Sequence, residues 1–356
     1  MPKVSFNNKQ NSFAQSLKTK VDQYFSEKQI KKTGNLELYL KTAILIPAAL
    51  LIYVLLLTVN IPGGVQLLLA GLLGAILASI GFNVMHDACH GSYSQRKRVN
   101  ELLGLSLNAL GGNAFIWKFK HNILHHTYTN VDGMDDDIAK SPLMRQCRSQ
   151  KWVPAHRYQH IYVVLVYAIS SFAWVFIMDF NKYLKQKVYT TPLQKMSLQD
   201  HLIFWLSKVL YLIFYVAIPV YLVGWGPWAL GFTAMHLVMG LTLALVFQLA
   251  HVVEHTEFEA THGEVTQIEN AWAEHQVRTT ANFAPDNLFV NWFVGGLNYQ
   301  VEHHLFPRIS HVHYPALSKI VQETCQEHGL PYYTYPTMTA SMISHFRMMK
   351  ALGEKP

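Results

Sequence analysis

The sequence predicts an all-α integral membrane protein with four transmembrane helices in two hairpins and a cytoplasmic helical cap. Three observations lead to this fold class. First, 51% of the 356 residues are hydrophobic and only 14% are charged, far fewer than the roughly 25% of a soluble domain. Second, long apolar runs alternate with basic segments. Third, the chain has 19 histidines, and many of them gather just past the ends of the apolar runs.

Four apolar runs have the length of a membrane-spanning helix, which needs about 20 residues. They cover residues 42–59, 64–84, 202–223 and 229–250. Uncharged turns at 60–63 and 224–227 join them in pairs, which predicts two hairpins. Basic residues lie in the segments on the other side of the bilayer, as in positive-inside loops, so both termini are expected in the cytoplasm.

A fifth apolar run, residues 161–178, is predicted to be an interfacial helix. Histidine clusters end at residue 126 and resume at residue 251. They can meet on one side of the membrane only if the chain between them crosses an even number of times. Lys182 and Lys185, which follow the run, place it on the cytoplasmic side.

The chain divides into three regions. Residues 1–40 are polar and lysine-rich with apolar positions at helical spacing, which predicts an amphipathic helix lying on the membrane. Residues 41–315 form the membrane domain, and residues 316–356 form a cytoplasmic C-terminal segment. No secretory signal is found, and three distant cysteines do not form a disulfide framework.

The net charge is +7, and the basic residues that produce it lie in the segments between the apolar runs. This distribution favours an anionic lipid bilayer as the partner and excludes nucleic acid. The absence of a targeting peptide favours a bacterial inner membrane, with the endoplasmic reticulum second.

Histidine clusters follow the cytoplasmic ends of the spans. Histidines four residues apart lie on one face of a helix about 6 Å from each other, which suits a metal chelate. The candidate ligands are His86, His90, His121, His125, His126, His251, His255, His303 and His304. Nine imidazoles exceed the roughly four ligands of one zinc ion, so the cap is expected to hold a di-metal centre. Imidazole suits several metals and does not by itself name one.

In chain order the clusters have the form H-x3-H, H-x3-HH and Q-x2-HH. This order, between paired apolar runs, resembles the integral membrane fatty acid desaturases over roughly residues 40–315. The third cluster begins the sequence QVEHHLFP at residues 300–307. That form is similar to the front-end group, the delta-6 and delta-5 or linoleoyl-CoA desaturases, which add a double bond between an existing one and the carboxyl end.

The resemblance implies an oxidoreductase that uses O2 and two iron ions to desaturate a fatty acyl chain, carried as acyl-CoA or acyl-lipid. The seven histidines of the three clusters are then ligands, and no other catalytic side chain is needed. Gln300 stands where related enzymes have a histidine, either as a weak ligand or as a donor to a ligand. Because residues 247–251 resemble a family segment, His251 is the favoured extra ligand and His255 the alternative. Zinc is expected to replace iron readily in overexpressed protein.

Many front-end desaturases carry a fused cytochrome b5 domain with a His-Pro-Gly-Gly motif, which this chain lacks. A separate electron donor is therefore expected, a ferredoxin or a cytochrome b5 with its reductase, docked on basic residues near the clusters. Asp87, Glu254 and Glu302 are candidates to orient the imidazoles through their second nitrogen. The acidic run 135–137 is a further candidate, although it is interpreted first as a solvated loop.

Two other functions are compatible with histidine clusters. A fatty acyl hydroxylase of the same superfamily would release an alcohol, but the QVEHHLFP form favours desaturation. A membrane metal transporter needs polar groups at mid-membrane depth, and the four spans are nearly free of them.

Overall fold

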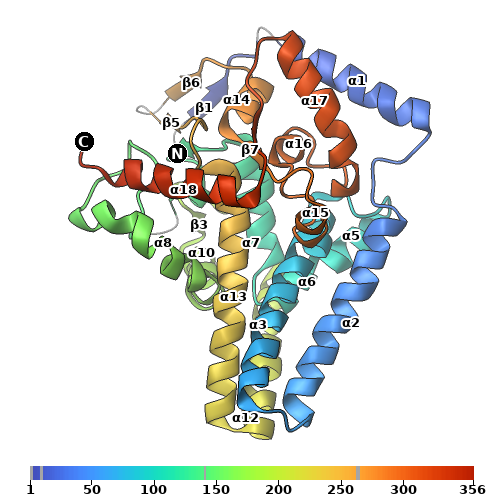
Figure 1. The fold of residues 1–356 in the computed structure, drawn as a ribbon, viewed down its shortest axis with the longest axis vertical. Coiled ribbons are helices and arrows are strands. Elements are labelled where there is room, and N and C mark those ends of the chain that lie inside the picture. The colour runs from blue at the N-terminus through green and yellow to red at the C-terminus, as the bar shows by residue number, and fades with distance from the viewer. Residues whose placement is uncertain (1–2, 9–10, 140–141, 262–264) are drawn as a thin grey trace.

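The computed structural model describes residues 3–8, 11–139, 142–261 and 265–356. Long helices form a narrow stem, and the remaining elements form a broad cap above it (Figure 1). Within the described residues, four helices are long and apolar enough to cross a membrane: Leu36–Thr58, Gly63–His90, Leu198–Val223 and Trp225–His251. They contain the four runs predicted to span, apart from one residue at the end of the first run.

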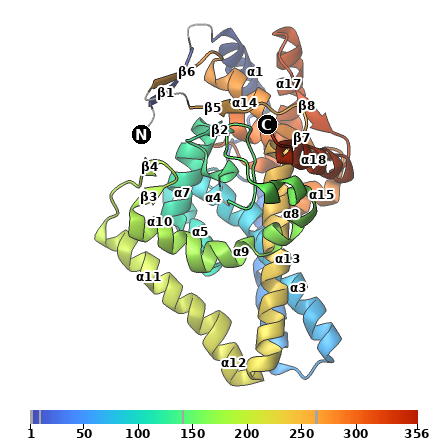
Figure 2. The ribbon, with the colours of Figure 1, turned by 90° about the vertical axis from the view of Figure 1, so that its left-hand side faces the viewer.

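Each span is built from one or more regular segments. The first is α2 (Leu36–Thr58), and the second joins α3 (Gly63–Ile80), the π-helix η1 (Gly81–Met85) and α4 (His86–His90). The third joins α11 (Leu198–Leu212), the π-helix η6 (Ile213–Ala217) and α12 (Ile218–Val223), and the fourth is α13 (Trp225–His251). Figure 2 shows α11 and α12 descending to the narrow end of the stem, where α13 begins.

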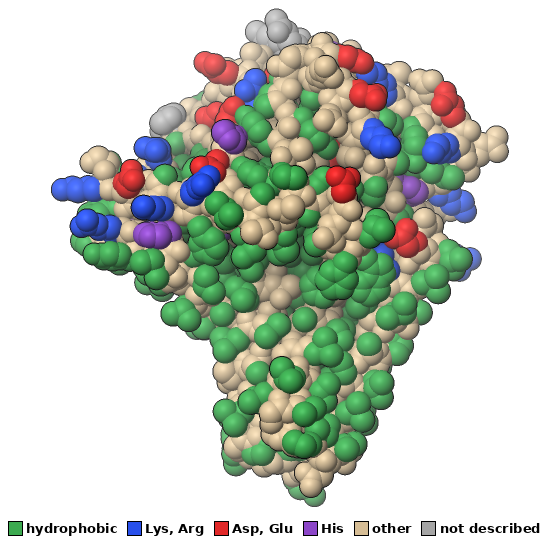
Figure 3. Space-filling view, in the orientation of Figure 1, with side chains coloured by type: hydrophobic (Ala, Val, Ile, Leu, Met, Phe, Trp, Pro, Cys, Tyr) green, Lys and Arg blue, Asp and Glu red, His purple; other side chains and the backbone are tan. Residues whose placement is uncertain are grey.

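The stem exposes apolar side chains. Leu68 is 75% exposed and Tyr221 is 88% exposed. Figure 3 shows hydrophobic side chains along the narrow end, whereas lysine, arginine and carboxylate side chains gather on the cap. Such a surface is unfavourable in water and favourable in a bilayer.

Helices α3 and α13 pack closely in the middle of the stem. A Cβ atom on Gly74 would lie 2.1 Å from the backbone oxygen of Met235, so only glycine allows this approach. A wider apolar core extends upward from this contact into the base of the cap.

The fifth apolar run forms a broken helix. One half comprises η4 (Pro154–Tyr158) and α8 (Gln159–Ala168), and the other comprises α9 (Ser170–Ala173), η5 (Trp174–Met178) and α10 (Asp179–Lys185). The halves are bent by 59°. Ile161 and Leu165 on the first half and Ile177 on the second are more than half exposed.

The N-terminal region packs on the cap. Strand β1 (Lys3–Phe6) pairs in parallel with β6 (Val265–Ile268), and α1 (Ser12–Lys28) lies against α17 (Tyr314–Glu327). The segment predicted to be an amphipathic helix does form a helix, and its apolar face packs against the protein. Its apolar residues Phe13, Leu17, Val21 and Phe25 are buried in a protein core with α17, so they are not available to lipid.

The other elements of the cap are short. The helices are α5 (Lys97–Gly104), α6 (Ser106–Ala109), α7 (Ala114–Lys118), η2 (Phe119–His125), η3 (Asp136–Ile138), α14 (Trp272–Thr279), α15 (Leu288–Phe293), α16 (Gln300–Leu305), η7 (His311–His313) and α18 (Met338–Gly353). The strand pairs are β2 (Val131–Asp132) with β5 (Glu259–Ala260), β3 (Lys187–Val188) with β4 (Thr191–Pro192), and β7 (Ala281–Phe283) with β8 (Tyr333–Tyr335). They surround the upper ends of the spans.

Candidate metal centre

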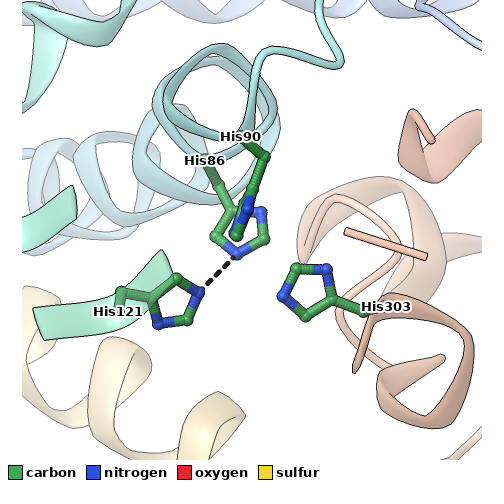
Figure 4. A group of neighbouring side chains, drawn as sticks. All are labelled: His86, His90, His121 and His303. Carbon is green, nitrogen blue, oxygen red and sulfur yellow. Dashed lines mark hydrogen bonds between the residues drawn. The ribbon is translucent and has the colours of Figure 1, made fainter. Parts of the chain in front are cut away.

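Eight of the nine histidines singled out in the sequence converge inside the cap, and all eight are buried. They come from α4 (His86, His90), from η2 and the residue after it (His121, His125, His126), from the end of α13 (His251) and from α16 (His303, His304). Figure 4 shows four of them pointing toward one another.

Local backbone features aim these side chains. The π-helices η1 and η2 lie immediately before His86 and around His121, and such wide turns are frequent at functional sites. Gly91 ends α4 directly after His90 in a left-handed conformation with φ 76°, which glycine adopts without strain. The last carbonyl of α13, that of His251, accepts a hydrogen bond from the Asn130 side chain at 2.9 Å.

The histidines form two adjacent groups. In the first, one nitrogen each of His86, His90, His121 and His303 lie within 4.8 Å of one another, and His86 Nε2 is 3.2 Å from His121 Nε2 (Figure 4). The second group is His125, His251 and His304, within the same limit. His126 groups with His303 and His304, so it lies between the two positions.

In three of these rings, Nδ1 contacts a residue outside the cluster and Nε2 has no partner in the described part of the chain. The Nδ1 atoms of His125, His303 and His304 lie 3.0 Å from Asp135 Oδ2, 3.1 Å from the Tyr314 hydroxyl and 2.9 Å from Gln276 Oε1, respectively. Their buried Nε2 atoms have no hydrogen-bond partner among the described residues. An unpaired buried polar atom is costly, and a ligating histidine shows this same division between its two nitrogens. The residues therefore fit a pair of bound metal ions.

Four of the rings, those of His121, His126, His303 and His304, have a pKa that favours the neutral form. Burial, and next the charge on neighbouring imidazoles, lowers the pKa of His121, His126, His303 and His304 well below the ordinary value. A neutral imidazole offers a lone pair, which is the form that binds a metal.

His255 lies apart from the cluster. It is exposed, has φ 79° just beyond the end of α13, and stacks on Tyr333 with ring centroids 5.9 Å apart. Gln300 is the first residue of α16 and is buried, and its Nε2 has no hydrogen-bond partner among the described residues.

The three carboxylates singled out in the sequence make their closest contacts with residues other than the candidate metal ligands. Asp87 accepts a hydrogen bond from Ser310 Oγ at 2.6 Å, and Glu302 accepts one from Tyr332 at 2.9 Å. Burial raises the pKa of Glu302 to about 7. The side chain of Glu254 is 39% exposed.

The acidic run 135–137 is not a solvated loop, because all three aspartates are buried. Asp135 contacts His125, while Asp136 and Asp137 pair with Lys182 at 2.5 Å and Lys120 at 2.8 Å. The solvated-loop interpretation is therefore wrong, and these carboxylates hold the second histidine cluster in place.

Other residues around the centre carried no sequence signal of their own. Gln276 on α14 and Tyr314 on α17 contact His304 and His303, yet neither stands in a motif. Thr129 Oγ1 lies 2.7 Å from the His125 carbonyl and 3.1 Å from His304 Nδ1. Only its position four residues after His125 could have indicated a role.

Two apolar cavities lie below the centre. The upper one, about 540 Å³, is lined by residues of α2, α3, α6, α11 and η6, among them Ile46, Leu50 and Ile80. Ile80 directly precedes η1, which leads to His86. The lower cavity, about 490 Å³, shares Tyr53 and other residues with it. These apolar walls suit the tail of a lipid.

The chain is similar to known desaturases over most of its length. Residues 62–336 match the family model described as fatty acid desaturase. The sn-1 linoleoyl-lipid 6-desaturase of Synechocystis sp. (strain ATCC 27184 / PCC 6803 / Kazusa) is 37% identical, over 99% of this chain and 98% of that protein. The enzyme of the same name from Arthrospira platensis is 35% identical, over 99% and 96%. An acyl-lipid (8-3)-desaturase of Physcomitrium patens is 34% identical, over 95% and 71%.

The histidine cluster, the apolar spans and these similarities agree with one another. The chain belongs to the fatty acid desaturase family, whose members are oxidoreductases that introduce double bonds into fatty acyl chains.

Proposed function

We propose that this chain desaturates the acyl chains of membrane lipids on the carboxyl side of an existing double bond. The names of its relatives, which act on linoleoyl-lipid and acyl-lipid, support the lipid carrier and the position. The observation that carries the chemistry is the convergence of eight buried histidines, in which the Nε2 atoms of His125, His303 and His304 have no hydrogen-bond partner among the described residues.

The proposed ligands form two sets. His86, His90, His121 and His303 would hold one iron ion, and His125, His251 and His304 would hold the other. His126 lies where it can serve either ion. His255 is left out because it is exposed and outside the cluster. When bound, the two irons supply the O2-dependent removal of two hydrogens from neighbouring methylenes.

The protein's own residues position the metal-binding nitrogens and shield the acyl chain from water. Asp135, Gln276 and Tyr314 hold the outer nitrogens of three histidines and so fix the inner nitrogens in place. The apolar cavity below Ile80 can take an acyl tail and exclude water from it. The distance along this cavity then sets which carbons reach the centre.

The arrangement in the membrane follows from the spans. We propose two hairpins, α2 with the α3 span and the α11 span with α13, and a cap with both termini on the cytoplasmic side. The positions of basic residues on the cap support this orientation. A separate one-electron donor, a ferredoxin or cytochrome b5, would then reach the cap from the cytoplasm.

The test is expression in a host that lacks desaturases and is fed linoleate, with lipids profiled by gas chromatography–mass spectrometry. The parent should form a new double bond between the carboxyl end and the existing one. The His303→Ala, His304→Ala double variant should form none, because both proposed metal positions lose a ligand.

Two results would contradict this proposal. Hydroxylated chains would assign the protein to the hydroxylase alternative. A new bond on the methyl side of the existing one would keep the desaturase and reject the front-end position.

A further inference from the structure

A polar cavity of about 580 Å³ lies where the stem meets the cap. One wall is the link between α1 and α2, and the other is the segment that follows the first histidine cluster. Lining residues include Lys31, Thr33, Asn35, Tyr39, Ser94 and Arg96. In the part of the chain that the structure describes, no aspartate or glutamate lines this pocket.

Two cations of this pocket are not neutralised. Lys31 and Arg96 are exposed and form no salt bridge with any described carboxylate. Neighbouring lysines do have such partners: Lys32 with Asp22 at 2.5 Å, Lys41 with Glu37 at 3.4 Å and Lys97 with Glu101 at 3.6 Å. A concave site with unpaired cations and no acid attracts an anion, and a guanidinium matches a phosphate with two parallel hydrogen bonds.

The two walls are tied to each other. The backbone N–H of Gly34 donates to the Ser92 carbonyl at 3.0 Å, and a Cβ on Gly34 would lie 2.7 Å from the Tyr93 carbonyl. The Asn35 side-chain oxygen accepts hydrogen bonds from the backbone N–H groups of Glu37 at 2.9 Å and Leu38 at 3.4 Å, at the start of α2. The pocket is therefore a formed feature of the fold and not a gap between loose segments.

The polar pocket and the upper apolar cavity are lined by the same two parts of the chain. Tyr39 of α2 lines the pocket, and Ile46, two turns or about 10 Å further along the same helix, lines the apolar cavity. Likewise Arg96 directly precedes α5, and Leu105 directly after α5 lines the apolar cavity. A basic polar site and an apolar cavity that follow each other along α2 and α5 match a lipid with an anionic headgroup.

In the sequence, one wall of the pocket begins shortly after a proposed metal ligand. Ser94 follows His90 by four residues. Desaturation near the carboxyl end requires the ester linkage, and hence the headgroup, to lie close to the metals. The short separation in sequence agrees with this requirement.

We infer that this pocket binds the anionic headgroup of the glycerolipid whose acyl chain is desaturated. The inference rests on the proposed desaturation of acyl-lipids and adds the class of headgroup. Lys31 and Arg96 bind the headgroup phosphate, and they determine which lipids are used without changing which carbons react.

The test uses the metal-loaded enzyme, supplied with O2 and a reduced ferredoxin or cytochrome b5, in nanodiscs with equal amounts of phosphatidylglycerol and phosphatidylcholine that carry the same linoleoyl chains. Its variants are Lys31→Ala with Arg96→Ala, and a matched control, Lys28→Ala with Arg98→Ala, which removes the same charge from exposed cations just outside the pocket. Products are measured for each headgroup by mass spectrometry. Native mass spectrometry of the metal-free protein measures retained phosphatidylglycerol independently of activity.

The parent and the control should convert and retain phosphatidylglycerol in preference to phosphatidylcholine. The pocket variant should lose about tenfold or more of that preference, the effect of one or two charge-assisted hydrogen bonds, with the new double bond at the same position. Equal use of both lipids by the parent, or a pocket variant that matches the control, overturns the inference.

Two further results distinguish the headgroup inference from the proposed function. If linoleoyl-CoA alone is converted, and its conversion depends on Lys31 and Arg96, the pocket binds the phosphates of coenzyme A and the headgroup assignment is overturned. If the parent retains phosphatidylglycerol through these residues but forms no unsaturated product from any substrate, the proposed function fails and the lipid site stands.

Discussion

A histidine has two ring nitrogens, and the environment of each decides what the residue can do. At His125, His303 and His304 the outer nitrogen is held by Asp135, Tyr314 or Gln276, and the inner nitrogen faces other imidazoles. His251 and His255 have the same spacing as a chelating pair, yet only His251 lies in the cluster. The backbone separates them, because α13 ends at His251 and His255 follows in a turn with positive φ.

This difference can be measured by metal analysis of purified variants. His251→Ala should lower the bound iron from about two ions per chain toward about one and abolish desaturation, because it removes one of three ligands of the second group. His255→Ala should keep both the iron and the activity of the parent. Loss of iron in the His255 variant, with iron retained in the His251 variant, would reverse the assignment.

His345 on α18 gives a prediction about pH. It is fully buried, with Nδ1 2.7 Å from the Val252 carbonyl and Nε2 3.0 Å from the Tyr167 hydroxyl, and burial lowers its pKa from 6.5 to about 4. The folded state therefore binds this proton less readily than the unfolded state. The stability that this residue contributes is present above pH 6.5 and is lost as the pH falls toward 4, by up to about 3 kcal/mol.

Melting temperatures in detergent at pH 7.5 and pH 5 test this contribution. The parent and the variant at an exposed histidine, His255→Asn, should lose more stability at pH 5 than His345→Asn does. An equal loss in all three proteins would show that His345 does not contribute to the acid sensitivity.

At the scale of elements, two of the interruptions of regular helix lie next to the candidate centre. The second span passes through the π-helix η1 before it presents His86 and His90, and the π-helix η2 contains His121 and His125. The fifth apolar run is broken and bent by 59° beside the stem. The ion pair of Lys208 with Asp179, at 3.2 Å, joins its second half to α11.

The packing of α3 on α13 is the clearest case of a contact that depends on one glycine. Gly74→Ala would place a methyl group 2.1 Å from the Met235 carbonyl, and relieving this clash should cost about 1–3 kcal/mol. Gly71→Ala on the same helix meets its nearest atom, a Val238 methyl, at 3.4 Å and should be tolerated. Thermal unfolding of both variants in detergent measures the difference. Equal melting temperatures would contradict the proposed close approach.

At the scale of the whole molecule, a long apolar stem carries a cap that contains the centre (Figures 1 and 3). The loops at the narrow end and the elements of the cap must lie on opposite sides of a membrane if the four helices cross it. The eight histidines of the candidate centre all lie at the cap end of the spans. If the four helices cross the bilayer, the proposed centre lies beside the bilayer surface.

Labelling of single cysteines in sealed vesicles tests this orientation. Gly226→Cys lies at the start of α13, at the narrow end of the stem, where a Cβ meets nothing within 4 Å, and Lys350→Cys lies on α18 of the cap. A membrane-impermeant maleimide should label Lys350→Cys from the cytoplasmic side only and Gly226→Cys from the opposite side only. The native thiols Cys89, Cys147 and Cys325 are buried and should give little background. Labelling of both positions from one side would contradict four crossings.

Local patterns in the sequence were sufficient to locate the four long apolar helices and eight of the nine histidines that converge in the cap, but they also selected His255. A run of about 20 apolar residues has few stable alternatives to a membrane helix, because backbone polar groups must be paired within the segment. Histidines four residues apart share a helical face whatever surrounds them. These properties are local, so residues 42–59 or 86–90 could be interpreted without knowledge of the rest of the chain.

Which residues those elements contact depends on the tertiary structure. The apolar face of α1 is equally suited to lipid and to protein, and only the nearby α17 determines that it is buried in the cap. Asp135 looked like a loop residue until the fold placed it against His125, and Gln276 reaches His304 across a separation of 28 residues. The sequence by itself thus determined which segments form long apolar helices and, apart from His255, which histidines come together, because periodicity and composition are local. Which atoms meet depends on contacts between distant segments, and only the folded chain sets those.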